Sequence, residues 1–205
     1  MEWTDALFQL GTAVFAVTGV LAAARQNMDV MSFLIIGVVT AVGGGTLRDL
    51  ILDAPVFWVE DVRYVSVAAA AALATFVFEQ RFRATFRAFL YLDALATAVF
   101  AILSTGKALA LGAGPGPAVL MGVVTGIGGG LIRDVLVGHP TLLLSRELFM
   151  TPVLVGSALY AGGVALGSPP APLALIAIAV TAGIRAGAIR FGWSFPDSLT
   201  YKPLA

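Results

Sequence analysis

The sequence predicts an all-α membrane protein with seven transmembrane helices, arranged as two inverted three-helix repeats followed by a seventh helix. Three observations lead to this fold class. The 205-residue chain is 59% hydrophobic and only 12% charged, whereas a soluble domain carries about 25% charged residues. Its uncharged runs have the length of membrane-spanning helices, and its mean hydropathy is +0.95. The first half of the chain also recurs in the second half at a constant spacing.

The positions of the uncharged runs predict where the seven spans lie. A helix needs about 20 apolar residues to cross the hydrocarbon core. Clusters of Gly and Pro mark turns, so we divide the longer runs at residues 112–117 (GAGPGP) and 167–172 (GSPPAP). The predicted spans are residues 6–24, 30–47, 64–78, 88–106, the part of 108–132 that follows its turn, and two spans within 148–184.

The internal repeat is visible in two matched blocks. TAVFA begins at Thr12 and again at Thr97, and GVVTAVGGGTLRD at Gly37 is matched by GVVTGIGGGLIRD at Gly122. Both matches have an offset of 85 residues, without a gap. Each unit holds three spans, and an odd number inverts the second copy relative to the first. Repeats of this kind recur in transport proteins, with the solute path at their interface.

The repeat divides the chain into three parts. We predict a first three-helix repeat at residues 1–87, a second, inverted repeat at 88–169, and a seventh helix with a cytoplasmic tail at 170–205. Seven spans place the two termini on opposite sides of the membrane.

Charged residues between the spans predict the orientation, because Lys and Arg remain cytoplasmic. One side of the membrane receives Arg25, Arg81, Arg83, Arg87, Arg146, Arg190 and Lys202. The other side receives Glu2, Asp5, Glu60, Asp61, Arg63 and Lys107. We therefore expect a multi-pass protein of the cell inner membrane, with a periplasmic or extracellular N-terminus and a cytoplasmic C-terminus. The start MEWTD lacks the positive charge of a signal peptide, so we expect the first span to be retained.

Three consecutive glycines lie inside the second span and three inside the fifth. They are Gly43, Gly44 and Gly45, and Gly128, Gly129 and Gly130. Each Gly costs about 1 kcal/mol against Ala in a helix interior, so a triplet needs a reason. Small residues permit close helix packing. Alternatively, a triplet kinks or unwinds its helix beside a polar pathway, which membrane depth tolerates only around a cavity or inside protein.

An Arg-Asp pair follows each triplet, as Arg48-Asp49 and Arg133-Asp134. Charges at membrane depth are expensive and face a bundle interior or water. Thr40 and Gly44 share a helix face with Arg48, and the same holds for Thr125, Gly129 and Arg133 in the second copy. Because the repeats are inverted, we expect one such cluster near each mouth of a shared path. The alternative is that the Arg and Asp side chains pair across repeats and hold the fold together.

Asp93 lies several residues into the fourth span, where the first repeat has Phe8. It either attracts cations at the cytoplasmic entrance or pairs with an Arg.

The residues contain no enzyme constellation, so we expect no catalysis and no cofactor. GIGGG at residues 126–130 is not a dinucleotide-binding turn, since it lies in a span with no strand before it. One His and no Cys leave no metal-ligand spacing. Zero formal net charge gives no reason to expect nucleic acid as a partner.

The two GGGxxRD motifs, each ending the second helix of a three-helix unit, resemble those of bacterial members of the trimeric intracellular cation (TRIC) channel family. The same sequences are also grouped as a glycine transporter domain. This resemblance implies a homotrimer in the lipid bilayer, with a pore through each protomer that conducts monovalent cations, K⁺ and some Na⁺. It also implies that the pore runs beside kinked second and fifth spans, which carry the glycine triplets.

Three functions follow as alternatives. A cation channel needs a continuous polar path. A secondary transporter for a small solute such as glycine would instead use the inverted repeats for alternating access. A purely structural membrane protein is disfavoured by Arg-Asp pairs in both copies.

Overall fold

The fold is a bundle of helices with one isolated two-residue bridge, between Glu147 and Ser194, in the described part of the chain. The computed structural model describes residues 2–24, 26, 28–82, 85–144 and 147–196. Its helices are α1 (Glu2–Ala23), α2 (Val30–Ile51), α3 (Phe57–Glu60), α4 (Arg63–Phe82), α5 (Phe86–Ala110), α6 (Pro115–Val137), the 3-10 turn η1 (Leu142–Leu144), α7 (Met150–Ala165) and α8 (Pro170–Phe191).

The helix ends follow the local sequence. Asp29 caps α2 by accepting the Ser32 N–H at 2.8 Å, which holds the pKa of Asp29 below its ordinary value. Thr85 caps α5 in the same way. Gly138 and Gly192 end α6 and α8 in the left-handed conformation, with φ of +73° and +67°, where a residue without Cβ is favoured.

Five of these helices are long and apolar enough to cross a membrane, namely α1 from Trp3 onward, α2, α5, α6 and α8. The protein is therefore an all-helical membrane protein. The apolar helix α7 has only 16 residues, and α4 bears charges at both of its ends. A total of seven crossing helices stays a prediction.

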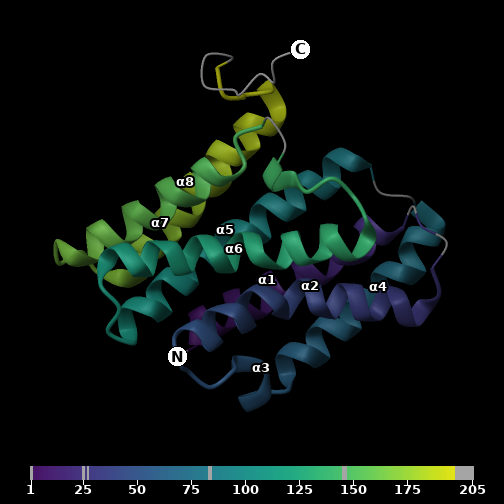
Figure 1. The fold of residues 1–205 in the computed structure, drawn as a ribbon, viewed down its shortest axis with the longest axis horizontal. Helices are drawn as coiled ribbons and strands as arrows, with labels where there is room; N and C mark the ends of the chain where they lie inside the picture. Colours follow the sequence, from purple (N-terminus) through teal and green to yellow (C-terminus); the bar gives the residue numbers. More distant parts are fainter. Residues whose placement is uncertain (1, 25, 27, 83–84, 145–146, 197–205) are drawn as a thin grey trace, which may run out of the picture.

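The helices form two units that follow the repeat. Helices α1, α2 and α4 pack together, as do α5, α6 and α7, while α2 packs against α6 and α1 against α5 between the units. Figure 1 shows α2 and α6 side by side at the centre. The 85-residue offset carries the first residue of α2 onto the first residue of α6, and the first residue of α3 onto that of η1. The domain boundaries predicted from the repeat stay predictions.

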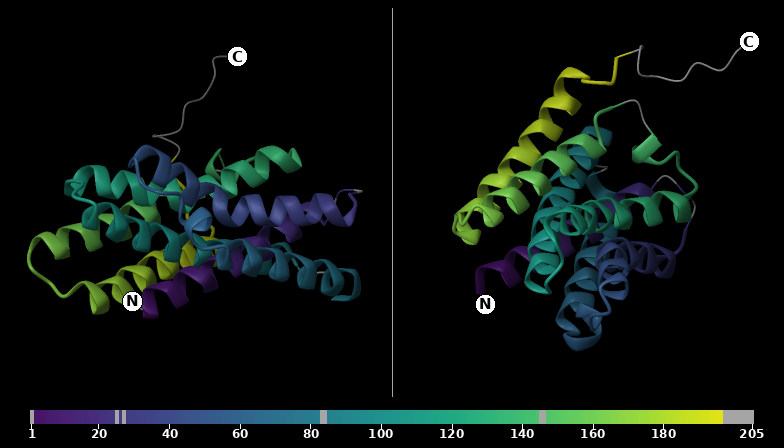
Figure 2. Two further views of the ribbon diagram at one scale, coloured as in Figure 1. Left: turned by 90° about the horizontal axis from the view of Figure 1, so that it is seen from below. Right: turned by 60° about the vertical axis from the view of Figure 1, so that its left-hand side comes forward.

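Helix α8 has no counterpart in the repeat and packs on α5 and α7. In the views of Figure 2 it runs beside α7 at one flank of the bundle, away from α3 and α4. Several residues used to predict the orientation lie outside the described residues: Arg25, Arg83, Arg146, Lys202, the side chain of Arg81 and the tail from residue 197. The orientation in the membrane stays a prediction.

An aromatic row fills the contact between the first helices of the two units. The rings of Phe15 and Phe100 lie 5.1 Å apart, and those of Phe8 and Phe100 lie 4.5 Å apart. Phe15 and Phe100 are fully buried. This row packs α1 against α5. It thereby holds in place the polar side chains that the two helices direct into the bundle, which are described below.

Candidate functional site

The glycine triplets lie where α2 crosses α6. A Cβ added to Gly44 would stand 2.2 Å from the carbonyl oxygen of Thr125, and one added to Gly129 would stand 2.3 Å from that of Thr40. Each middle glycine therefore lets its helix touch the backbone of the other helix. Both helices continue unbroken through their triplets. Close packing thus explains the middle glycines, and the alternative of unwound helices is wrong; a bend in either helix stays a prediction.

The outer glycines of each triplet meet different neighbours. A Cβ on Gly43 would lie 2.9 Å from Ile132 Cδ1, and one on Gly128 would lie 3.3 Å from the Gly44 backbone. Gly45 faces the Phe57 ring, while Gly130 faces the Arg133 guanidinium. The triplets therefore allow the two helices to touch, and they also leave space for the Phe57 ring beside Gly45 and for the Arg133 guanidinium beside Gly130.

The two threonines expected beside the triplets are fully buried. Thr40 Oγ1 donates to the Ile36 carbonyl at 2.6 Å, and Thr125 Oγ1 donates to the Met121 carbonyl at 2.7 Å. Their hydroxyl protons are thus used inside their own helices.

Arg48 is the centre of the first charged cluster, which we call the Arg48 cluster (Arg48, Asp49, Ser104, Lys107). Its Nε donates to Asp49 Oδ1 at 2.8 Å, and its Nη1 donates to Ser104 Oγ of α5 at 2.9 Å. Lys107 of α5 also reaches Asp49 Oδ1, at 2.8 Å. The cluster therefore joins the two repeats, since Ser104 and Lys107 belong to the second one.

Aromatic rings cover the Arg48 guanidinium. Its Cζ lies 5.4 Å from the centre of the Phe8 ring and 5.7 Å from that of Phe57, within cation–π range. The Phe57 backbone N–H donates to Asp49 Oδ2 at 3.0 Å. A buried arginine and its carboxylate are thus held from several sides, as buried charges require.

Arg133 is the centre of the second cluster, the Arg133 cluster (Arg133, Asp134, Asp93, Thr18). Arg133 Nε donates to Asp134 Oδ1 at 2.8 Å, and Nη1 forms an ion pair with Asp93 Oδ1. The same Nη1 lies 3.2 Å from Thr18 Oγ1 on α1. Of the two alternatives for Asp93, pairing with an arginine is the one observed.

The two clusters share a frame that the repeat explains. Asp49 accepts the backbone N–H eight residues later, and Asp134 accepts that of Leu142, again eight residues later. Each arginine also binds a hydroxyl from the other repeat. Asp49 and Asp134 each pair with the arginine that precedes them in the same helix, so the alternative of Arg–Asp pairs across repeats is not what the structure shows. The links across repeats are Arg48–Ser104, Lys107–Asp49 and Arg133–Thr18.

The crossing places the clusters on opposite sides of the α2–α6 contact. Because Gly44 meets Thr125 while Gly129 meets Thr40, the two helices run antiparallel. Arg48 and Arg133 follow their triplets toward opposite ends of the bundle. That each cluster lies near a mouth of a shared path stays a prediction.

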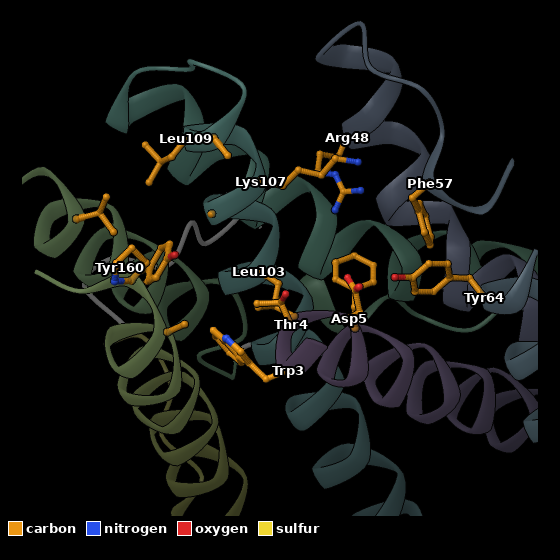
Figure 3. Close-up of a pocket in the computed structure, with 16 residues that line it drawn as sticks. Trp3, Thr4, Asp5, Arg48, Phe57, Tyr64, Leu103, Lys107, Leu109 and Tyr160 are labelled. Atoms are coloured by element: carbon orange, nitrogen blue, oxygen red, sulfur yellow. The ribbon is translucent and has the colours of Figure 1, made fainter. Parts of the chain in front are cut away.

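A cavity of about 660 Å³ opens beside the Arg48 cluster. It is lined by residues of α1, α2, α3, α4, α5, α7 and α8, and Figure 3 shows the Arg48 and Lys107 side chains near each other, above those of Asp5 and Tyr64. Most of its lining is apolar or aromatic, including Trp3, Phe8, Phe57, Leu103 and Tyr160. Of the predicted site residues only Arg48 lines this cavity; α6 contributes none.

Sequence reasoning missed three functional candidates. Ser104 and Lys107 complete the Arg48 cluster, and Arg185 of α8 is buried beside Glu147. Lys107 and Arg185 each adjoin the end of a predicted span; the sequence predicts Lys107 outside the membrane and gives Arg185 no role. An ionisable residue within one turn of a span was the available signal. Among the described residues no group of three or more His, Asp or Glu side chains could hold a metal ion.

Comparison with known proteins identifies the family. A family model described as "Glycine transporter" matches residues 5–80 and again 90–165, once per repeat. The chain is 42% identical over 197 residues to the UPF0126 inner membrane protein YadS of Escherichia coli K12, covering 95% of this chain and 94% of that protein. It is 30% identical to the UPF0126 membrane protein YvgT of Bacillus subtilis, with 96% of each covered.

Solved structures agree with this assignment. A TRIC trimeric intracellular cation channel orthologue from Rhodobacter sphaeroides superposes with a TM-score of 0.90 at 39% identity, covering 94% of this chain and 100% of that chain. A second structure, solved to explain conductance through TRIC cation channels, superposes with a TM-score of 0.87 at 31% identity, covering 98% of both. The chain therefore belongs to the TRIC channel family, which the glycine transporter model also describes.

Proposed function

We propose that this protein is a monovalent cation channel that conducts K⁺ and some Na⁺ through a path in each protomer. The observation that carries the proposal is the likeness, over nearly the full chain, to a TRIC cation channel orthologue at 39% identity. Buried charged clusters in a membrane bundle support it, since such residues mark ion paths. The similar structures are of channels, which fits a protein that is not an enzyme and needs no cofactor.

The proposed path runs beside kinked α2 and α6, from the cavity at the Arg48 cluster to the Arg133 cluster. Its lining or gating residues are those predicted from the motifs: Thr40, Gly43, Gly44, Gly45, Arg48, Asp49, Asp93, Thr125, Gly128, Gly129, Gly130, Arg133 and Asp134. The backbones meet at Gly44 and Gly129, so ions pass along the side of this contact and not through it. The cavity supports this route because it reaches Arg48.

The functional unit that we propose is a homotrimer in the inner membrane, with seven spans per protomer, a periplasmic or extracellular N-terminus and a cytoplasmic C-terminus. Its partners are the lipid bilayer and monovalent cations. The word "trimeric" describes the Rhodobacter orthologue, and "inner membrane" describes the Escherichia coli relative. Many large apolar side chains on the outside of the bundle, such as Ile35, Leu50 and Val77, fit contact with lipid or with another copy.

Ion flux into liposomes tests the channel. Vesicles that contain the purified protein and K⁺ are diluted into K⁺-free N-methylglucamine buffer with a voltage-sensitive dye. A channel gives a rapid K⁺ diffusion potential, a weaker one with Na⁺, and none with N-methylglucamine. Folded protein whose vesicles give no K⁺ potential contradicts the proposal.

A glycine carrier is the second candidate, and one observation favours it. The cavity presents the cations Arg48 and Lys107 opposite the carboxylate of Asp5, which are the charges that an amino acid's carboxylate and ammonium need. The name of the matched family model also points to it. The same vesicles, given radiolabelled glycine, accumulate it if the protein is a carrier, and K⁺ then produces no potential without glycine.

A further inference from the structure

Arg185 of α8 is buried yet poorly paired. Its side chain is 3% exposed. Nη1 lies 3.3 Å from both Glu147 Oε2 and the Leu148 carbonyl oxygen, and Cζ stands 4.6 Å from the Phe149 ring centre. Nε and Nη2 are buried and have no hydrogen-bond partner among the described residues. Since buried polar groups are nearly always hydrogen-bonded, this guanidinium has spare binding capacity.

Helix packing brings Arg185 opposite Asp93. Helices α5 and α8 are antiparallel, because Phe89 shares a buried cluster with Ile189 while Ile102 shares one with Ala174 and Ala177. One turn further along each helix, Asp93 of α5 and Arg185 of α8 lie at matching levels of this antiparallel pair.

Asp93 has spare capacity as well. Its Oδ1 is bound to Arg133, but its buried Oδ2 has no hydrogen-bond partner in the described part of the chain. The Arg133 cluster contains two carboxylates and one guanidinium, so it has one negative charge in excess. A free carboxylate oxygen in a cluster of net charge −1 is a place for a cation.

We propose that Asp93 Oδ2 is a binding position for the permeating cation and that Arg185 is the gate that competes for it. The proposal rests on the proposed channel function and names a residue of that path. In the observed arrangement the guanidinium is held by Glu147 at 3.3 Å, and Asp93 Oδ2 is free. In the competing arrangement the Arg185 guanidinium binds Asp93 and so prevents K⁺ from binding there.

Glu147 decides between the two arrangements. Its side chain is 39% exposed, so its hold on Arg185 is weakened by water, whereas a pairing of Arg185 with Asp93 would be buried. Charge-assisted hydrogen bonds strengthen away from water. Loss of the Glu147 charge therefore sends Arg185 to Asp93, and loss of the Arg185 charge leaves Asp93 open.

Four variants in the liposome assay test the competition between Arg185 and the permeating cation for Asp93. We expect Arg185→Gln to raise K⁺ flux about tenfold, the size of one removed like charge beside a partly screened site. Glu147→Gln should lower flux several-fold, and the double variant should behave like Arg185→Gln. Arg185→Lys should stay near the parent protein because it keeps the charge. Arg190→Gln on the exposed surface of α8 and Glu60→Gln in α3 are the matched controls.

A binding measurement separates this proposal from the channel itself. K⁺ should raise the melting temperature of the detergent-purified protein, relative to N-methylglucamine, most in Arg185→Gln and least in Glu147→Gln and Asp93→Asn. If the parent shows no flux but this order holds, the channel proposal fails and the cation position at Asp93 stands. If the parent conducts but Arg185→Gln and Glu147→Gln match their controls in flux and in K⁺-dependent melting, the inference about Arg185 is overturned.

Discussion

The Arg48 and Arg133 clusters are two copies of one motif with opposite net charge. Both hold an arginine against the aspartate that follows it, and in both the aspartate accepts a backbone N–H eight residues later. The first cluster adds Lys107, so its formal charge is +1. The second adds Asp93, so its formal charge is −1.

This difference in charge arises at matched positions where the two repeat copies carry different residues. Asp93 stands where the first repeat has Phe8, and Phe8 faces Arg48 with its ring as Asp93 faces Arg133 with its carboxylate. Lys107 stands where the first repeat has Ala22. The two copies thus share a common frame, and different residues on the neighbouring helix give the first cluster a positive and the second a negative formal charge.

The largest expected effect comes from removing the central arginines. Arg133→Met leaves Asp93 without its ion-pair partner and Asp134 without a guanidinium, and breaking a buried pair costs about 3–5 kcal/mol. Arg48→Met should cost clearly less, because Asp49 keeps Lys107. Thermal unfolding of the two variants in detergent compares them.

Asp93→Asn in the Arg133→Met background should recover part of that loss. Equal destabilisation by Arg48→Met and Arg133→Met would show that the different charges of the clusters do not matter for stability.

Alanine substitutions at the α2–α6 contact should destabilise the protein to a similar extent in both repeat copies. Gly44→Ala and Gly129→Ala each press a methyl group onto a backbone carbonyl, and overpacking of this kind costs about 1–3 kcal/mol. Gly43→Ala is the matched control, because its neighbour is the flexible end of Ile132. Loss of folded protein by size-exclusion chromatography and a lower melting temperature report the effect. Tolerance of both middle substitutions would refute the close contact.

A smaller effect is expected at a hydrogen bond found only in the first copy. Trp58 Nε1 donates to Thr46 Oγ1 at 2.9 Å, and the corresponding residues in the second copy are Leu143 and Leu131. Trp58→Phe should lower the free energy of unfolding by about 1 kcal/mol. Thr46→Val in the same background should then add little; a full additional loss would mean that the two groups act independently.

The smallest change in stability is expected for Lys107→Met. Its side chain is one-third exposed, and Asp49 keeps Arg48, so melting should hardly move. One cation fewer on the cavity wall should instead raise K⁺ flux about twofold, as expected for a charge about 8 Å away in a watery mouth. Arg63→Met, at the exposed start of α4, is the control. A fall in flux would indicate that Lys107 holds the mouth open.

The sequence alone determined the membrane class, the helical repeat and the arginine–aspartate motif. Apolar composition and length decide whether a segment enters a bilayer, and both are local properties. The motif was also readable without contacts, because an ionisable residue inside an apolar run is costly wherever its neighbours lie.

Only the tertiary structure decided what the motif residues contact. The choice between packed and unwound glycines depended on α6 meeting α2, and the partner of Asp93 depended on which helix faces it. Lys107 and Arg185 became part of the charged interior because α5 and α8 turn them inward. A membrane helix is apolar nearly all round, so its sequence pattern does not say which face meets another helix. That choice is made by the packing of the whole bundle.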